Sequence, residues 1–214
     1  MVNETIFNEI SSFTKNKKAT LVAVSKLKPA GDITQMYSRG QRHFGENYVQ
    51  ELVEKQAQLP LDINWHFIGH LQSNKVKYIA PFVHLIQSVD SEKLLKEIDK
   101  QAAKNNRIIN VLLQVHIAEE TTKFGYDEVE LMAFDIAQYK NINIIGLMGM
   151  ATFTDDKEKV KREFEHLQKI YNAFASKKNI VLTTLSMGMS DDYKLAIECG
   201  SNMIRIGSLL FGKR

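Results

Sequence analysis

The stretch "LVAVSKLKP" (21–29) runs from an apolar strand straight into a lysine. Four apolar residues come first, and Ser25 and Lys26 follow them directly. A strand that is apolar on both faces is typical of a parallel sheet covered by helices. A buried ammonium group is costly unless something uses its charge. Lys26, at the end of such a strand, is therefore the first candidate functional residue.

Seven more apolar runs of similar length follow along the chain. The eight runs predict strands at "TLVAV" (20–24), "RHFG" (42–45), "WHFIG" (65–69), "HLIQSV" (84–89), "NVLLQVHI" (110–117), "NIIGLM" (143–148), "VLTTLSM" (181–187) and "MIRIG" (203–207). Amphipathic patterns between them predict helices at 32–40, 46–58, 73–80, 91–104, 126–140, 155–176 and 191–200, with one more helix before the first strand. Ser91 has the character of an N-cap for the helix over 91–104.

Eight strands that alternate with helices favour a single α/β domain over residues 1–214, a (β/α)8 TIM barrel. An open, doubly wound sheet is the alternative, and it would carry a glycine fingerprint after its first strand. That strand is followed here by "SKLKPAGD" (25–32), which contains no GxGxxG. The chain also shows no linker and no low-complexity tract, so we expect one domain.

Composition excludes several classes of protein. The 214 residues include 28 Lys and Arg against 25 Asp and Glu, and the basic residues are scattered, so we expect no nucleic-acid binding. No apolar run reaches transmembrane length, so we expect no membrane association. A single cysteine, Cys199, excludes an internal disulfide and fits a reducing compartment. We expect a cytoplasmic protein, and a monomer, because no exposed apolar stripe is evident.

Two glycine–serine turns follow the last two predicted strands, in "SMGMSDD" (186–192) and "RIGSLLFG" (205–212). In TIM barrels, the loops after strands 7 and 8 often bind phosphate beside a helix N-terminus. Close backbone approach and hydroxyl donors would come from Gly188, Gly207, Ser190 and Ser208. The same residues also fit ordinary turns with helix caps, and this alternative stays open.

Lys26 facing a phosphate site suggests an imine with a phosphorylated aldehyde, because a desolvated lysine is a competent amine nucleophile. Two ligand classes fit: a sugar phosphate in an aldolase, or pyridoxal 5′-phosphate (PLP). Arg205 precedes the second turn. If it points inward, its guanidinium would keep a pyridine nitrogen unprotonated and weaken the cofactor as an electron sink. If it points outward, it is a rim residue.

Six motifs spanning nearly the whole chain carry a resemblance to a known family. They are "AVSKLKP" (23–29), "HFGENYVQE" (43–51), "WHFIGHLQSNK" (65–75), "GLMGMA" (146–151), "LSMGMSDD" (185–192) and "MIRIGSLLFG" (203–212). Together they resemble the pyridoxal phosphate homeostasis protein family, formerly called proline synthetase co-transcribed proteins. The resemblance implies a barrel like the N-terminal domain of alanine racemase, with PLP as its cofactor.

The resemblance also implies roles for eight residues of this chain. Lys26 would form the Schiff base, and Arg205 would face the pyridine nitrogen. Ser190, Gly207 and Ser208 would bind the phosphate, and the ring and its substituents would be lined by Asn47, Met148 and Met189. Position 208 is Ser where the family frequently has Thr, which keeps the hydroxyl.

The function predicted from these features is to hold PLP in vitamin B6 homeostasis, with indirect effects on amino-acid balance and possible delivery to PLP-dependent client enzymes. We expect no enzymatic turnover, because alanine racemase needs a second base from a second domain, and we expect no such domain here. A racemase-like PLP enzyme and a lysine-imine aldolase are the alternatives. Tyr48 and Tyr193 could approach the mouth of the barrel, at the carboxyl ends of the strands, but neither lies in a racemase-like context. His66 and His70 do not share a helix face, so no metal site is expected.

Overall fold

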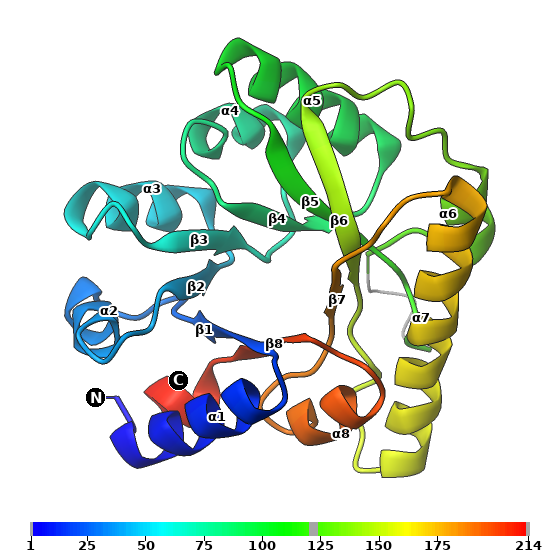
Figure 1. The fold of residues 1–214 in the computed structure, drawn as a ribbon. Coiled ribbons are helices and arrows are strands. Elements are labelled where there is room, and N and C mark those ends of the chain that lie inside the picture. The colour runs from blue at the N-terminus through cyan, green and yellow to red at the C-terminus, as the bar shows by residue number, and fades with distance from the viewer. Residues whose placement is uncertain (1, 120–123, 213–214) are drawn as a thin grey trace.

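A computed structural model describes residues 2–119 and 124–212, so the predicted domain's end residues 1 and 213–214 lie outside the described ranges. Within these ranges, parallel strands pair in chain order and close into a barrel, with the last strand paired back to the first (Figure 1). The strands are β1 (Thr20–Val24), β2 (His43–Glu46), β3 (Asn64–Phe67), β4 (Leu85–Val89), β5 (Ile109–Gln114), β6 (Ile142–Met148), β7 (Thr184–Ser186) and β8 (Met203–Ile206). The predicted TIM barrel is confirmed.

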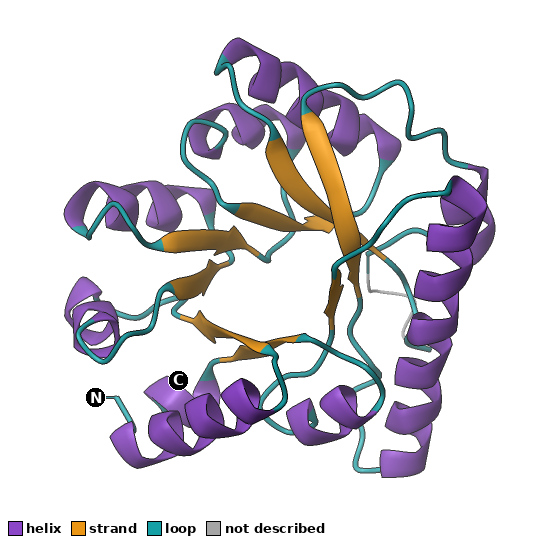
Figure 2. Ribbon diagram, viewed as in Figure 1, coloured by secondary structure: helices purple, strands orange, loops and turns teal. Residues whose placement is uncertain are grey.

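Helices surround the strands as an outer layer (Figure 2). They are α1 (Glu4–Asn16), α2 (Ala30–Tyr37), α3 (Val49–Gln58), the 3-10 turn η1 (Ser73–Lys75), α4 (Val76–Ile79), α5 (Glu92–Lys104), α6 (Glu128–Ala133), α7 (Lys157–Lys178), α8 (Tyr193–Glu198) and α9 (Ser208–Phe211). Ser91 caps α5 by accepting from the Leu94 amide, as predicted. The two ends of the described chain meet, because the Asn3 amide donates to the Leu210 carbonyl at 2.8 Å.

One predicted helix is much shorter than its sequence pattern. The pattern over 126–140 forms helix only at α6, because Phe134 is extended and turns the chain out of the helix. Lys178 then binds the carbonyls of Met132 and Phe134 from α7. Asp99 Oδ1 accepts from the Asn141 amide at 2.7 Å. Contacts from α5 and α7 thus stabilise an irregular segment where the apolar spacing alone predicts helix.

Other boundaries shift by a few residues at strand ends. The predicted strand over 181–187 is reduced to β7, and the strand over 110–117 ends with β5. The helix expected over 191–200 begins at Tyr193 instead, because Asp192 accepts from the Met189 amide at 2.6 Å and holds an additional turn before α8. These changes lengthen the loops at the carboxyl ends of the strands.

Both apolar and polar side chains fill the inside of the barrel. A small apolar cluster is formed there by Val22, Leu85, Leu112, Met148 and Met203. Gln87 follows Leu85 by two residues and Arg205 follows Met203 by two, so both share the inward face of their strands. Both are buried. The larger apolar core lies between the strands and the helices. No helix in the described ranges is both long and apolar enough to span a bilayer.

Candidate functional site

Lys26 leaves the carboxyl end of β1, where barrel enzymes place their chemistry. The Ser25 amide continues the β1 pairing by donating to the Gly45 carbonyl at 3.0 Å, so the strand keeps its path up to Lys26. The next residue, Leu27, has φ +60°, a left-handed conformation that is uncommon for a leucine. Lys26 itself is half-buried. The strand end and the sharp turn together aim this position at the mouth of the barrel.

A buried ionic cluster supports the residue before Lys26. Ser25 Oγ donates to Glu46 Oε1 at 2.6 Å, at the end of the adjacent β2. Lys55 Nζ, from α3, donates to the Ser25 carbonyl and to Glu46 Oε1, both at 2.7 Å. Burial raises the pKa of Glu46 to about 7, although Lys55 and Ser25 oppose the shift. Glu46 Oε2 is buried with no hydrogen-bond partner.

The same cluster supports the residue after Lys26. Glu51 Oε1 accepts from Lys55 Nζ and from the Leu27 amide, each at 2.6 Å. The Leu27 contact is a charge-assisted hydrogen bond, which is stronger than a neutral one. The peptide groups on both sides of Lys26 are therefore held by Lys55 and Glu51, and Glu46 binds the Ser25 side chain. Lys55 and Glu51 were not predicted as site residues, because "ELVEKQAQ" (51–58) has the charged residues of a solvated helix surface.

Arg205 points inward from β8 and is 4% exposed, which confirms an interior rather than a rim placement. Its Nη1 donates to Ser186 Oγ at 2.6 Å and its Nη2 donates to the Gly149 carbonyl at 3.1 Å, at the ends of β7 and β6. Burial lowers the pKa of Arg205 to about 10, partly opposed by Asp192. The guanidinium forms no ion pair with any carboxylate of the described residues. The buried guanidinium of Arg205 thus donates only to neutral acceptors, a hydroxyl and a carbonyl, among the described residues.

A chain of hydrogen bonds crosses the barrel from Arg205 toward the amino ends of the strands. Ser186 Oγ donates to Gln87 Oε1 at 2.7 Å, and Gln87 Nε2 lies 2.9 Å from His66 Nδ1. His66 Nε2 lies 2.9 Å from His43 Nδ1. Because Gln87 donates to Nδ1 of His66, that ring carries its proton on Nε2 and donates to His43. Each hydrogen bond in this series is donated in the direction away from Arg205. The guanidinium therefore stands at the donor end of the series.

The two predicted anion-binding turns meet in space. Ser208 Oγ and Ser190 Oγ are joined by a hydrogen bond of 2.9 Å, and Gly207 is the N-cap of α9. Gly188 has φ +100°, and a Cβ at this position would lie 2.6 Å from the Ala196 Cβ, so the turn requires glycine. Two hydroxyls and the backbone of two loops therefore gather at one point after β7 and β8.

The three residues predicted to line the ring have different environments. Asn47 directly follows β2, and its Oδ1 is buried without a hydrogen-bond partner. A Cβ on Gly69 would lie 2.3 Å from the Asn47 carbonyl oxygen, so this residue is packed against a neighbouring strand end. Met148 is fully buried in the apolar cluster inside the barrel. Met189 is 38% exposed.

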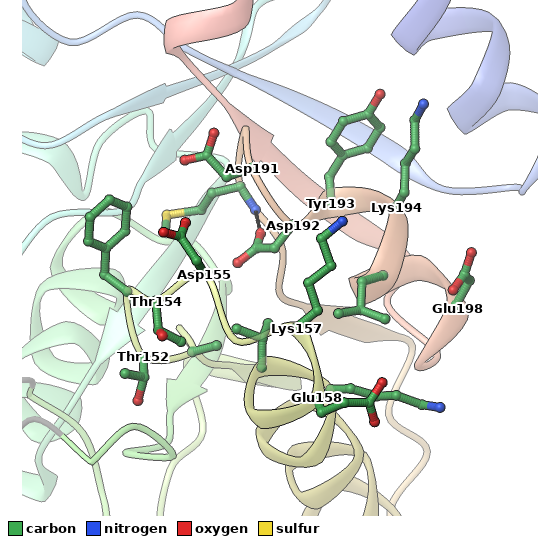
Figure 3. A pocket seen from close by; sticks show the side chains of 16 residues that line it. Thr152, Thr154, Asp155, Lys157, Glu158, Asp191, Asp192, Tyr193, Lys194 and Glu198 are labelled. Carbon is green, nitrogen blue, oxygen red and sulfur yellow. Dashed lines mark hydrogen bonds between the residues drawn. The ribbon is translucent and has the colours of Figure 1, made fainter.

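A cleft of about 650 Å³ lies beside this mouth, between the loop after β6 and the turn before α8 (Figure 3). Met189 and Asp192 line it, whereas Lys26 and Arg205 do not. Its walls carry both acidic and basic side chains, among them Lys157 and Asp191. Met189 and Asp191, on either side of Ser190, line the cleft, whereas Ser190 and Ser208 do not.

The two tyrosines considered as racemase-like bases differ in their surroundings. Tyr48 is 51% exposed and precedes α3. The Tyr193 ring packs edge-on against Phe13 of α1, with ring centres 5.8 Å apart. Tyr193 also lines the cleft beside the mouth, as expected, while its ring packs against α1 on the outside of the barrel.

The profile of the family described as the alanine racemase N-terminal domain matches residues 7–214. This chain belongs to that family. A curated relative, the pyridoxal phosphate homeostasis protein of Aquifex aeolicus, is 40% identical over 200 residues, covering 92% of this chain and 87% of the relative. The resemblance read from the six motifs is confirmed, and the chain belongs with the pyridoxal phosphate homeostasis proteins.

Solved structures agree with this assignment. PipY of Synechococcus elongatus, solved with PLP bound, is 35% identical with a TM-score of 0.88, and the match covers 97% of this chain and 100% of PipY. Alanine racemase of Clostridium difficile shares only the fold, at 13% identity and a TM-score of 0.74. That match covers 100% of this chain but 58% of the racemase. The barrel thus corresponds to part of the racemase, which continues beyond it.

Proposed function

We propose that this chain binds PLP as a Schiff base on Lys26 and acts in PLP homeostasis. The observation that carries the proposal is Arg205: a buried guanidinium on β8 that bonds a serine and a carbonyl and has no carboxylate partner among the described residues. Protein acceptors in those ranges account for two of its five N–H groups. An unprotonated pyridine nitrogen supplies the acceptor that such a donor lacks.

The remaining residues at the mouth fit the other parts of the cofactor. The paired hydroxyls of Ser190 and Ser208, with the backbone at Gly207, suit a phosphate. The partnerless Asn47 Oδ1 suits a hydroxyl donor on the ring. Met148 would contact the ring from inside the barrel, and Met189 would contact it from the side of the cleft.

Bound PLP supplies an electron sink for carbanions, and its strength depends on protonation of the ring nitrogen. Arg205 remains protonated at neutral pH, since its pKa is about 10, so it donates and cannot act as an acceptor. A ring nitrogen facing it is kept free of a proton. This chain therefore binds the cofactor while weakening its carbanion chemistry, which favours holding over turnover.

We propose further that residues 1–214 form one functional unit and that no turnover accompanies binding. Two-sided proton transfer needs a base on each face of the ring. Of the tyrosines considered, Tyr48 is exposed and Tyr193 packs on α1. The curated relatives are named as homeostasis proteins. Delivery of PLP to client enzymes, the monomeric state and the cytoplasmic location stay predictions.

The test is a visible spectrum of the purified protein after incubation with PLP, followed by borohydride reduction and peptide mapping. Lys26→Ala should lose the absorption band and the reduced pyridoxyl label. Lys28→Ala is the matched control, because Lys28 Nζ donates to the Phe211 carbonyl at 2.8 Å and should play no part.

Two outcomes would overturn the proposal. A label that remains on the Lys26→Ala chain would move the Schiff base to another lysine. A colourless protein that borohydride traps only with a sugar phosphate would indicate the imine aldolase instead. Racemisation or transamination of amino acids by the loaded wild type at ordinary enzyme rates would leave PLP binding intact but reject the role without turnover.

A further inference from the structure

Three histidines gather toward the amino ends of the strands, at the opposite end of the barrel from Lys26. His43 begins β2, His66 lies within β3, and His84 lies in the bend that enters β4. One nitrogen from each ring lies within 4.8 Å of the other two. The strands are neighbours in the barrel, and the His84 amide donates to the Trp65 carbonyl at 2.9 Å, so the backbone fixes the three positions relative to one another.

The spacing of the three rings can be compared with what a metal requires. Zinc bonds imidazole nitrogen at about 2.0–2.1 Å in tetrahedral geometry, which places ligand nitrogens about 3.3 Å apart and ring centres about 5 Å apart. The observed ring centres are separated by 5.1 Å for His43 and His66, 5.5 Å for His66 and His84, and 5.7 Å for His43 and His84. The triangle is nearly equilateral and close to the required size.

Two of the rings already have a polar partner for their other nitrogen. Metal-bound histidines almost always use that second nitrogen in a hydrogen bond, which orients the ring. If His66 binds through Nε2, its Nδ1 faces the Gln87 amide at 2.9 Å. If His43 binds through Nδ1, its Nε2 faces the Asn64 amide at 3.5 Å. Binding a metal through Nε2 would move the His66 proton to Nδ1. The Gln87 amide would then turn its oxygen toward Nδ1 and its NH2 group toward Ser186 Oγ, which can accept a hydrogen bond. The Asn64 amide can turn in the same way toward His43, so both rings have a suitable outer partner.

The electrostatic setting favours neutral imidazoles. Burial lowers the pKa of His43 to about 4 and that of His66 well below its ordinary range. The pKa of His84 is lowered by burial and by Arg107, whose guanidinium binds the Val83 carbonyl at 2.8 Å. All three rings therefore present lone pairs at neutral pH. The charge of Arg107 opposes any cation, so selection favours ions that form strong bonds to nitrogen over Mg²⁺ or Ca²⁺.

We propose that His43, His66 and His84 form a binding site for a divalent transition-metal ion such as Zn²⁺. His84 is exposed, which gives the ion an entry path and leaves a fourth position for water. The ion would link the amino ends of three adjacent strands. No metal site was predicted, because His66 and His70 do not share a helix face. The three histidines of this cluster meet only when the barrel forms. The proposal is independent of PLP binding.

The experiment is calorimetric titration of the untagged wild-type chain with Zn²⁺, together with thermal unfolding with and without the ion. We expect one bound ion per chain and a rise in melting temperature that increases with free Zn²⁺. Substitution with Co²⁺ should give the visible absorption of a four-coordinate site. Mg²⁺ at the same concentration should produce neither saturable binding nor stabilisation.

His84→Ala removes an exposed ligand and should fold, yet it should lose both the one-to-one binding and the thermal shift. His166→Ala removes another exposed histidine far along the chain, on α7, and should behave as wild type. Asn64→Leu, which removes only an outer partner, should weaken binding by about 10-fold or more. Absence of saturable Zn²⁺ binding to the wild type, or equal binding by His84→Ala, would overturn the proposal.

Discussion

Lys55 Nζ lies 2.7 Å from Glu46 Oε1, and the two side chains are 8% and 0% exposed. The pair sits under the turn that carries Lys26 and joins α3 to the end of β2. Taking two charges out of water is costly, and their attraction offsets this only when the remaining polar atoms are also bonded. Lys55 meets that condition, since it also binds Glu51 and the Ser25 carbonyl. Glu46 does not, because its Oε2 has no partner. The arrangement serves to hold position 26 rather than to maximise stability.

Lys55→Met should therefore destabilise the fold by about 1–3 kcal/mol, since the buried Glu46 carboxyl loses the cation that holds its pKa down and must take up a proton. Urea unfolding at about pH 8 measures the loss. Adding Glu46→Gln to this variant should recover part of it, because the amide is neutral without taking up a proton. Equal stability of Lys55→Met and wild type would show that the cluster contributes nothing.

Glu46 should also make stability depend on pH. Burial raises its pKa from 4.5 to about 7 in the folded state, so the folded chain binds more protons than the unfolded chain between these values. The contribution of Glu46 is thus fully present below about pH 4.5 and is lost as pH rises toward about 7. We compare the unfolding free energies of wild type and Glu46→Gln at about pH 5 and at about pH 7.5. The stability of wild type relative to the variant should be greater at the lower pH. Glu54→Gln, a change at an exposed residue, serves as the control and should show no such difference between the two pH values. A difference that is constant with pH would contradict the shift.

Gln87→Leu should break the chain of hydrogen bonds inside the barrel. Ser186 Oγ would lose its acceptor and His66 Nδ1 its donor, at a cost of about 1–3 kcal/mol for each buried group left unpaired. Arg205 would also lose the support that orients it, so PLP affinity should fall. Urea unfolding and a PLP titration measure the two effects. In Gln101→Leu on α5, where the amide bonds only Glu97, PLP affinity should be unchanged.

Gly188→Ala should damage the anion-binding turn. The new methyl group would meet the Ala196 Cβ at 2.6 Å in a backbone with φ +100°, so the expected loss of stability exceeds about 1 kcal/mol. Gly31→Ala is the matched change, since no atom lies within 4 Å of its Cβ and the residue is helical in α2. It should be stabilising by up to about 1 kcal/mol. Thermal unfolding of both variants checks the pair, and a PLP titration should show weaker binding for Gly188→Ala alone.

The strand and helix pattern could be predicted from the sequence because it depends on near neighbours. Runs such as "TLVAV" need both faces covered, and α5 begins where Ser91 can accept from the Leu94 amide. The prediction failed over 134–140, where apolar spacing is helical but Phe134 turns away under contacts from α5 and α7. Local spacing cannot include the effect of residues that lie about 40 positions away.

The position of the site at the carboxyl ends of the strands could also be predicted from the sequence. The carboxyl ends of parallel strands meet at one end of the barrel, so Lys26 and the turns after β7 and β8 were expected together. The hydrogen bond between Ser190 and Ser208 agrees with that expectation. The assignment of roles to Asn47, Met148 and Met189 came from the family resemblance, and their chemistry at the site stays a prediction.

Tertiary structure alone decided which polar residues are buried and what they contact. Lys55 looks solvated in its helix, yet it is buried because α3 packs on β2. Gln87 and Ser186 are 99 positions apart and meet only across the closed barrel. His84 joins His43 and His66 for the same reason. Periodicity along a chain reports which face of an element is apolar, whereas contacts between distant polar groups depend on closure of the sheet, which no local pattern encodes.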